Sequence, residues 1–462
     1  MKIEFYGSGF FLRIILLFFL VFRLSPVIWC QGNNTETVLS EVVARLARRE
    51  YASALELFDS LPADQKARIE IRIMHASILN AAGRTADAKN IANSIISADA
   101  KNTEALMILA DAAAVEGKER ERRTFLDRII AIDPNNVRAL NDLANISLKN
   151  QNLKVAANYF DRALSVEPNN GEALVGRATI YRYSRDQRNA ERLLNRAASL
   201  YPDWARPIYE RARLYKGAGL YADALEDFNA ALSLEPNNYW ALVDCGQLLM
   251  EMNRLQESLK YLSRAIEVEP GIFMAYVYSA AIKDETGDYA GAEKDYITLT
   301  KLKPDYYFGF EALGIIRMRN KQWTAARDAF LDAYKQAPKE YTYALLAAVN
   351  WMRAGKQADP KQFLAQVLRT VPKDTPEYLM IKLYYDLSGD SNVVISLENE
   401  KNTFTKSRML YYLASYYDIR GNKSLADRYY LMVQDQNASG SIEWRLNEMA
   451  LAERGLGKKV EK

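Results

Sequence analysis

The feature that most constrains this sequence is a proline that recurs every 34 residues. Eight prolines keep this interval without a gap: Pro134, Pro168, Pro202, Pro236, Pro270, Pro304, Pro338 and Pro372. A fixed period of roughly 20 to 50 residues is typical of repeat proteins, in which each repeat packs on its neighbours. The sequence therefore predicts one continuous array, although a length of 462 residues would otherwise suggest roughly two to four separate domains.

Small residues keep the same period. One series is unbroken and consists of Ala76, Ala110, Ala144, Ala178, Ala212, Gly246, Ala280, Gly314 and Ala348. A second series, with gaps, consists of Ala54, Ala88, Ala156, Ala190, Ala224, Ala292 and Ala326. We interpret these positions as close crossings of helices, where a larger side chain would overpack the core at a cost of about 1–3 kcal/mol.

Residues 137–170 show what one repeat contains. The apolar residues in its first part have helical spacing, and a break at residues 151–152 precedes a second helical stretch. Pro168 ends this stretch, and Asn170 offers an N-cap to the next helix. We therefore predict two short antiparallel helices in each repeat, which must stack on neighbouring repeats to complete a core.

The turn inside each repeat often holds a glycine. Seven such glycines are Gly83, Gly117, Gly219, Gly287, Gly355, Gly389 and Gly421. Glycine suits the left-handed backbone conformation that commonly closes the C-terminus of a helix. The turns therefore predict where the first helix of these repeats ends.

This pattern resembles that of the tetratricopeptide repeat family, which has small residues at places 8, 20 and 27 of the repeat and proline at place 32. In the repeat that starts at Val137, these places hold Ala144, Ala156, Ala163 and Pro168. The resemblance implies an all-α fold, a right-handed superhelical solenoid of stacked antiparallel helix pairs.

The resemblance covers roughly residues 35–440. We assign residues 31–440 to an array of about twelve repeats, which start at Thr35, Ile69, Thr103, Val137, Gly171, Ala205, Tyr239, Phe273, Tyr307, Tyr341, Thr375 and Ser407. Residues 441–457 are predicted to form a capping helix, and residues 458–462 a solvated tail.

Some repeats depart from the pattern. Arg122, Ser258 and Pro360 replace the alanine of the second helix. The stretch at residues 375–406 has only 32 residues, and we interpret it as an irregular helical hairpin. Either drift of the repeat or adaptation to a ligand would explain it.

Residues 1–30 differ from the rest of the chain. Lys2 and Arg13 precede an uninterrupted apolar run at residues 14–22, which is typical of a secretory signal peptide. An uncleaved membrane anchor and a buried soluble segment are the alternatives. We expect an exported protein, periplasmic or associated with the cell envelope if the source is bacterial, with membrane contact only through such an anchor.

Cys30 follows this apolar segment and suggests a second hypothesis. A cysteine at this place resembles the lipidation site of bacterial lipoproteins. That pattern requires a small residue before the cysteine, whereas Trp29 stands here. Removal of Cys30 with the signal peptide is therefore the simpler interpretation, and lipidation of Cys30 is the alternative.

The residues for most enzyme chemistry are missing. The sequence contains no phosphate-binding glycine loop, no HExxH and no CxxC, and it has one histidine, His75. We interpret His75 as a partly buried structural residue and Cys245, beside a crossing position, as a thiol of the core. We therefore expect neither an enzyme nor a metal or cofactor site. A net charge of +3 gives no argument for nucleic-acid binding.

The resemblance also implies where a ligand binds. In the family, the first helix of each repeat lines the concave side, which holds extended peptides or partner helices. Carried over place by place, the groove is predicted to include Arg206, Arg213, Trp240, Met250, Met274, Tyr278, Phe308 and Met318. It should be basic over residues 137–238, and apolar and acidic over residues 239–374. The alternative is that part of this apolar series packs inside tight superhelical turns.

These observations predict an exported scaffold that binds a protein or peptide partner, most plainly in cell-envelope assembly. A surface-exposed, adhesin-like binding protein is the alternative. An enzyme is the third class, and the repeat array leaves no room for a catalytic domain.

Overall fold

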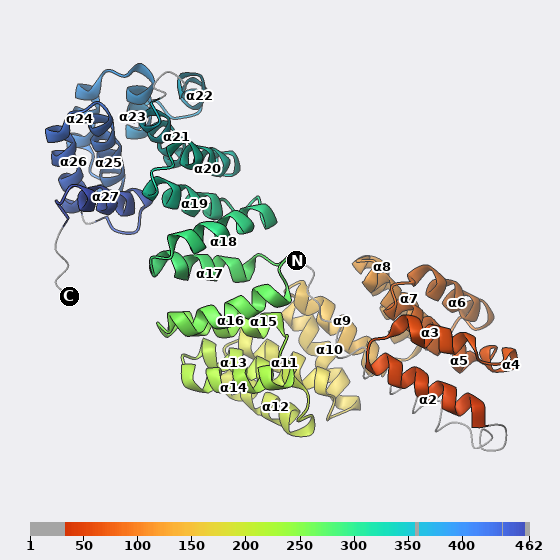
Figure 1. Cartoon of the computed structure of the whole chain (residues 1–462). Coiled ribbons are helices and arrows are strands. Elements are labelled where there is room, and N and C mark those ends of the chain that lie inside the picture. Colours follow the sequence, from red (N-terminus) through yellow and green to blue (C-terminus); the bar gives the residue numbers. More distant parts are fainter. Residues whose placement is uncertain (1–32, 356–359, 437, 458–462) are drawn as a thin grey trace. The chain divides into compact units, whose positions relative to one another are not determined.

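The computed structural model describes residues 33–355, 360–436 and 438–457. The predicted signal peptide, Cys30 and the tail at residues 458–462 lie outside these ranges. Every regular element in the described part of the chain is a helix, which confirms the all-α prediction (Figure 1). The chain divides into two compact units, unit 1 at residues 1–234 and unit 2 at residues 235–462.

Unit 1 is built from consecutive antiparallel helix pairs. Its helices are α2 (Asn33–Ala47), α3 (Tyr51–Asp59), α4 (Ala63–Lys66), α5 (Ile69–Ala81), α6 (Thr85–Ala98), α7 (Thr103–Val115), α8 (Glu119–Ile132), α9 (Val137–Lys149), α10 (Leu153–Val166), α11 (Gly171–Tyr183), α12 (Gln187–Leu200), α13 (Ala205–Gly217) and α14 (Tyr221–Leu234). The one-turn helix α4 lies between two pairs and has no counterpart in the repeat pattern.

Unit 2 continues the same arrangement of paired helices. Its helices are α15 (Tyr239–Glu251), α16 (Leu255–Val268), α17 (Met274–Glu285), α18 (Tyr289–Leu302), α19 (Tyr307–Arg319), α20 (Trp323–Gln336), α21 (Tyr341–Arg353), α22 (Pro360–Val367), α23 (Pro376–Asp386), α24 (Asp390–Asn399), α25 (Thr403–Ile419), α26 (Lys423–Asp435) and α27 (Ile442–Glu453). The helix that contains Ser407 begins earlier than the repeat pattern predicts, because Asn402 caps it.

Asparagine N-caps explain why the first helices begin where they do. Each cap accepts a hydrogen bond from the backbone nitrogen three residues later, and the five caps are Asn102, Asn136, Asn170, Asn238 and Asn402. Trp204 occupies the equivalent place between Asn170 and Asn238, and it makes no side-chain cap bond. At Asn136, Asn170 and Asn238 a repeated Pro-Asn-Asn string therefore ends one helix and starts the next, whereas Asn102 caps its helix without a preceding proline.

The turn inside each pair requires a left-handed residue. All seven glycines predicted for these turns have φ between 72° and 90°. Where glycine is missing, another residue takes the same conformation with φ of 58° or 59°: Arg49, Gln151, Arg185, Asn253 and Lys321. The fold thus imposes this backbone conformation even where the sequence lacks glycine, and such a residue destabilises the turn because its Cβ is crowded there.

The periodic small residues are the crossing points. The alanines of both series are at most 1% exposed. At the two glycines of the unbroken series, an added Cβ would lie 2.8 Å from Leu262 at Gly246 and 2.6 Å from a ring carbon of Phe330 at Gly314. Cβ atoms do not lie this close to their neighbours, so a side chain at either glycine would force Leu262 or Phe330 to shift, and the helices pack tightly at these points.

The departures from the repeat pattern have local compensations. Arg122 is buried and lies 3.1 Å from a carboxylate oxygen of Asp142. Ser258 donates a 2.6 Å hydrogen bond to the carbonyl of Gly246 in the facing helix. Pro360 is the first residue of α22, where its missing N–H costs nothing.

Candidate protein-binding surface

The predicted groove residues of unit 2 come from three successive first helices. Trp240 and Met250 lie on α15, Met274 and Tyr278 on α17, and Phe308 and Met318 on α19. We call the side formed by the first helices α15, α17, α19, α21 and α25 the first-helix face of unit 2. Phe308 is 49% exposed, whereas Met318 is 6% exposed and belongs to the core. The other four side chains are half-buried.

Part of the apolar series on these helices packs inside the protein. Its buried members are Val243, Ile315, Leu345, Leu346 and Met352, each at most 3% exposed. These residues and Met318 pack inside the protein, as the alternative interpretation of the sequence describes. The surface that could meet a partner is therefore narrower than the sequence predicts, and it centres on aromatic rings.

Phe308 is held in a row of aromatic rings. Its ring centroid lies 4.2 Å from that of Tyr307 and 5.7 Å from that of Tyr306. Tyr306 in turn contacts Phe273, and Tyr307 contacts Tyr343, at centroid distances of 6.3 and 6.1 Å. An exposed ring that is fixed by its neighbours loses little conformational entropy on binding, as is typical of interface anchors. Sequence reasoning missed the tyrosines of this row, although tyrosine opens three of the repeats.

Acidic side chains lie among these aromatic residues. Burial raises the pKa of Tyr278, and the nearby carboxylates of Asp244 and Glu251 raise it further. Burial also raises the pKa of Glu311, although this carboxylate accepts a hydrogen bond from Tyr343. The apolar and acidic character predicted for residues 239–374 thus rests on side chains that lie close together.

In unit 1, carboxylates hold several of the cations that were predicted to make the groove basic. Arg213 and Arg182 each lie 3.5 Å from an oxygen of Glu210, from two successive first helices. Arg138 pairs with Asp111 in the same way. The two predicted arginines also lie near rings, Arg206 at 6.0 Å from Trp204 and Arg213 at 5.7 Å from Tyr209. Such pairing reduces the net positive charge that this region presents.

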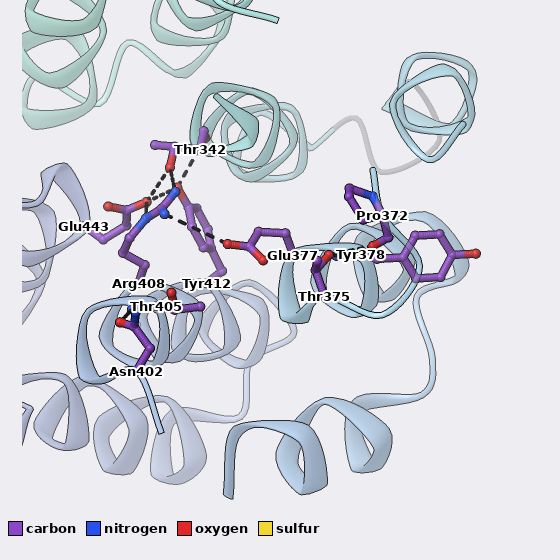
Figure 2. Close-up of polar contacts among 10 residues, drawn as sticks. All are labelled: Thr342, Pro372, Thr375, Glu377, Tyr378, Asn402, Thr405, Arg408, Tyr412 and Glu443. Carbon is purple, nitrogen blue, oxygen red and sulfur yellow. Dashed lines mark hydrogen bonds and ion pairs between the residues drawn. The ribbon is translucent and has the colours of Figure 1, made fainter. Parts of the chain in front are cut away.

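A buried polar network connects α27 with the first-helix face of unit 2. Glu443 on α27 is 1% exposed and accepts hydrogen bonds from Thr342 at 3.0 Å, Tyr412 at 2.8 Å and Arg408 at 3.3 Å (Figure 2). Arg408 also donates to the Thr342 hydroxyl and lies 4.0 Å from Glu377. These side chains come from α21, α23, α25 and α27, so the network joins the first helices of three successive repeats to a helix outside the repeats.

A second contact extends from α27 to an earlier repeat. Arg445 lies 2.7 Å from both carboxylate oxygens of Asp284, near the end of α17. The Asp284 side chain is 6% exposed, whereas that of Arg445 is 41% exposed. Asp284 lies in the range 239–374, for which the sequence predicts an acidic groove, but the sequence gives no indication of a partner 161 residues away.

The residues considered for chemistry have structural positions. His75 stacks on Phe58 with a centroid distance of 4.5 Å, and burial lowers its pKa. Cys245 is fully buried, as expected of a core thiol. In the part of the chain that the structure describes, no cluster of three or more metal-ligating side chains occurs. No helix in these ranges is long and apolar enough to cross a membrane.

Comparison with known families identifies the repeats. Tetratricopeptide repeat models match residues 141–204, 215–280 and 280–341. The chain contains tetratricopeptide repeats. Trp240, Met274 and Phe308 lie within the tetratricopeptide repeats that are matched directly.

Several solved structures resemble the tetratricopeptide array. PilF of Pseudomonas aeruginosa is 19% identical, with 44% of this chain and 92% of that chain covered, at a TM-score of 0.39. PilW, described as a widely conserved type IV pilus biogenesis factor, is 17% identical, with 45% and 97% covered, at 0.41. A chain of the APC/C hetero-tetramer Cut9–Hcn1 is 15% identical, with 65% and 59% covered, at 0.47. No curated protein matches the sequence.

Proposed function

We propose that this protein is an exported tetratricopeptide repeat scaffold that binds a protein or peptide partner on its first helices and performs no catalysis. The observation that carries the proposal is the aromatic row around Phe308, which presents a 49% exposed ring on a first helix of a matched repeat. Contiguous apolar patches on the surface mark interaction sites in soluble proteins, and the ring of Phe308 is continuous with the rings of Tyr306 and Tyr307.

Export and a role in assembly of the cell envelope rest on the sequence of residues 1–30. If the source is bacterial, fractionation of cells and protease treatment of intact cells test this part. We expect the protein in the envelope fraction and protected from external protease. Digestion in intact cells would instead favour the adhesin-like alternative, and a cytoplasmic location would contradict export.

The binding surface is tested by Trp240→Ala combined with Phe308→Ala. Aromatic anchors each contribute about 2 kcal/mol or more where they are hot spots, so the affinity for the physiological partner should fall at least about tenfold. Stability should change little, because both side chains are at least partly exposed. The partner is to be isolated with the chain that lacks residues 1–30 and then titrated.

A matched control removes exposed apolar side chains elsewhere. Tyr221 on α14 and Leu431 on α26 are 36% and 41% exposed, and both lie on second helices. Tyr221→Ala with Leu431→Ala should leave the affinity unchanged. If the control weakens binding as much as the aromatic pair does, the partner binds another side of the array.

The arginines of unit 1 should act differently. Arg206→Ala with Arg213→Ala should slow association and reduce its dependence on salt, because surface charges mainly steer the encounter. Stopped-flow association at several salt concentrations measures this. An association rate equal to that of the wild type would exclude Arg206 and Arg213 from the binding surface.

A further inference from the structure

Helix α27 buries a face that is unusually polar. Glu443 and Asn447 are 1% and 0% exposed. With Leu451, which is 0% exposed, they are spaced four residues apart and share one face of the helix. Among the residues that the structure describes, neither polar atom of the Asn447 side chain has a hydrogen-bond partner. A buried amide that loses its water without gaining a partner weakens the packing of the helix that carries it. The docking of α27 is therefore less favourable than that of an apolar capping helix.

The contacts of α27 go beyond the end of the array. A cap needs to cover only the last helix pair, α25 and α26, and α27 does pack on both (Figure 1). However, Arg445 of α27 pairs with Asp284 on α17, which belongs to a hairpin four repeats earlier. Glu443 of the same helix reaches Thr342 on α21. The first-helix face of unit 2 therefore holds α27 as it would hold a ligand.

The chemistry of these contacts defines what the site accepts. Two hydroxyls and a guanidinium, from Thr342, Tyr412 and Arg408, surround one carboxylate. On the opposite side, the Asp284 carboxylate receives one guanidinium. Side chains two residues apart on a helix point in different directions. Only a helix that has partners on both flanks satisfies the two groups together.

We propose that Asp284, Thr342, Arg408 and Tyr412 form a helix-binding site that α27 fills within the same chain, and that the partner is an amphipathic helix with a Glu-x-Arg pair that displaces α27. This inference deepens the proposed function and rests on it for the existence of a partner. The cost of the unsatisfied Asn447 amide makes α27 the exchangeable occupant. The partner helix is expected to lack that asparagine.

The test uses a labelled peptide of residues 441–457, added to the full chain, with binding measured by fluorescence anisotropy. Arg445→Ala and Asp284→Ala break the same ion pair. The first changes α27, and the second changes the proposed binding site. Arg445→Ala should bind the peptide at least about tenfold more tightly than the wild type, a shift of about 1.4 kcal/mol, because the peptide's own arginine restores the bond to Asp284. Asp284→Ala should show no such gain, because the site itself has lost the carboxylate.

Equal binding by the two variants, or no gain with Arg445→Ala, would overturn the proposal and make α27 a permanent cap. Circular dichroism shows whether either variant unfolds. If one does, amide hydrogen exchange of the wild type decides: α27 should exchange faster than α25 through local opening. Equal protection of the two helices would overturn the proposal. The peptide is the chain's own, so these results do not depend on finding the physiological partner.

Discussion

The regular repeats at residues 103–234 and the C-terminal part at residues 341–453 use the same helix pairs but are held together differently. In the regular part, polar contacts join residues that are about one repeat apart. Arg162, for example, donates a 2.8 Å hydrogen bond to the carbonyl of Pro134, 28 residues earlier. Such contacts follow the period of the sequence, so each repeat is stabilised by its neighbours.

The C-terminal part keeps contacts of this kind, such as the 2.8 Å hydrogen bond from Tyr384 to the carbonyl of Tyr412, and adds contacts between helices that are not neighbours in the array. Thr342 and Glu443 are 101 residues apart, and Asp284 and Arg445 are 161 residues apart. The first kind of contact builds an extendable array, whereas the second ties its end back to earlier repeats. The comparison shows that the period of the sequence determines the architecture. The contacts that do not follow the period determine how the array ends.

The largest expected effect concerns the aperiodic contacts. Glu443→Ala leaves the Arg408 guanidinium without its hydrogen-bonded carboxylate, and breaking a buried pair in this way costs about 3–5 kcal/mol. Denaturant unfolding of the full chain measures the loss. Glu448→Ala on the exposed side of α27 is the control and should be nearly neutral. Equal losses in the two variants would show that the network contributes nothing.

The periodic contacts predict a smaller loss. Ala212 is fully buried at a crossing in unit 1, so Ala212→Phe should destabilise by about 1–3 kcal/mol through overpacking. Ala222 lies exposed on the second helix of the same pair, and Ala222→Phe is the matched control. An unchanged thermal unfolding curve for Ala212→Phe would mean that the helices do not cross closely there.

Loss of an N-cap should lower the free energy of unfolding by about 1 kcal/mol. Asn102 accepts a 2.9 Å hydrogen bond from the backbone nitrogen of Ala105, and Asn102→Ala should cost about 1 kcal/mol. Asn135 stands beside a cap but caps no helix itself, so Asn135→Ala should cost much less in the same unfolding experiment. A reversed order of the two would contradict the assignment of the caps.

The smallest expected effect has the opposite sign. Arg185 occupies a left-handed turn with φ of 59°, where glycine stands in most other repeats. Arg185→Gly removes the backbone strain but raises the conformational entropy of the unfolded chain. The net increase in the free energy of unfolding should be up to about 1 kcal/mol. Gly117→Ala is the counterpart and should destabilise. If Arg185→Gly destabilises as well, the turn does not impose the left-handed conformation.

The sequence predicts most of the fold because the fold repeats. The left-handed turn at Gly117, the crossing at Ala212 and the cap at Asn102 each follow from a residue type that recurs with the period. Spacing also places Phe308 on a first helix, where the structure leaves it exposed. Met318 occupies an equivalent kind of place and is buried, because burial depends on how closely the neighbouring helices approach.

The network around Glu443 could not be predicted in this way. Glu443 and Arg445 belong to a single helix that has no counterpart in the repeats, so no recurrence points to their partners. A carboxylate on an amphipathic helix is solvated in most proteins, and only the three-dimensional arrangement shows that this one is 1% exposed. Contacts between distant parts of a chain leave no periodic signal.

A double-mutant cycle between Asp284 and Arg445 tests most directly whether α27 folds back onto the first helices of unit 2. The free energy of unfolding is measured for the wild type, Asp284→Ala, Arg445→Ala and the double variant. We expect a coupling energy of about 0.5–3 kcal/mol, as for residues in direct contact. A control cycle between Arg445 and Glu285, the exposed neighbour of Asp284, should be additive. Additivity within about 0.3 kcal/mol in the Asp284–Arg445 cycle would contradict the closed end of the array.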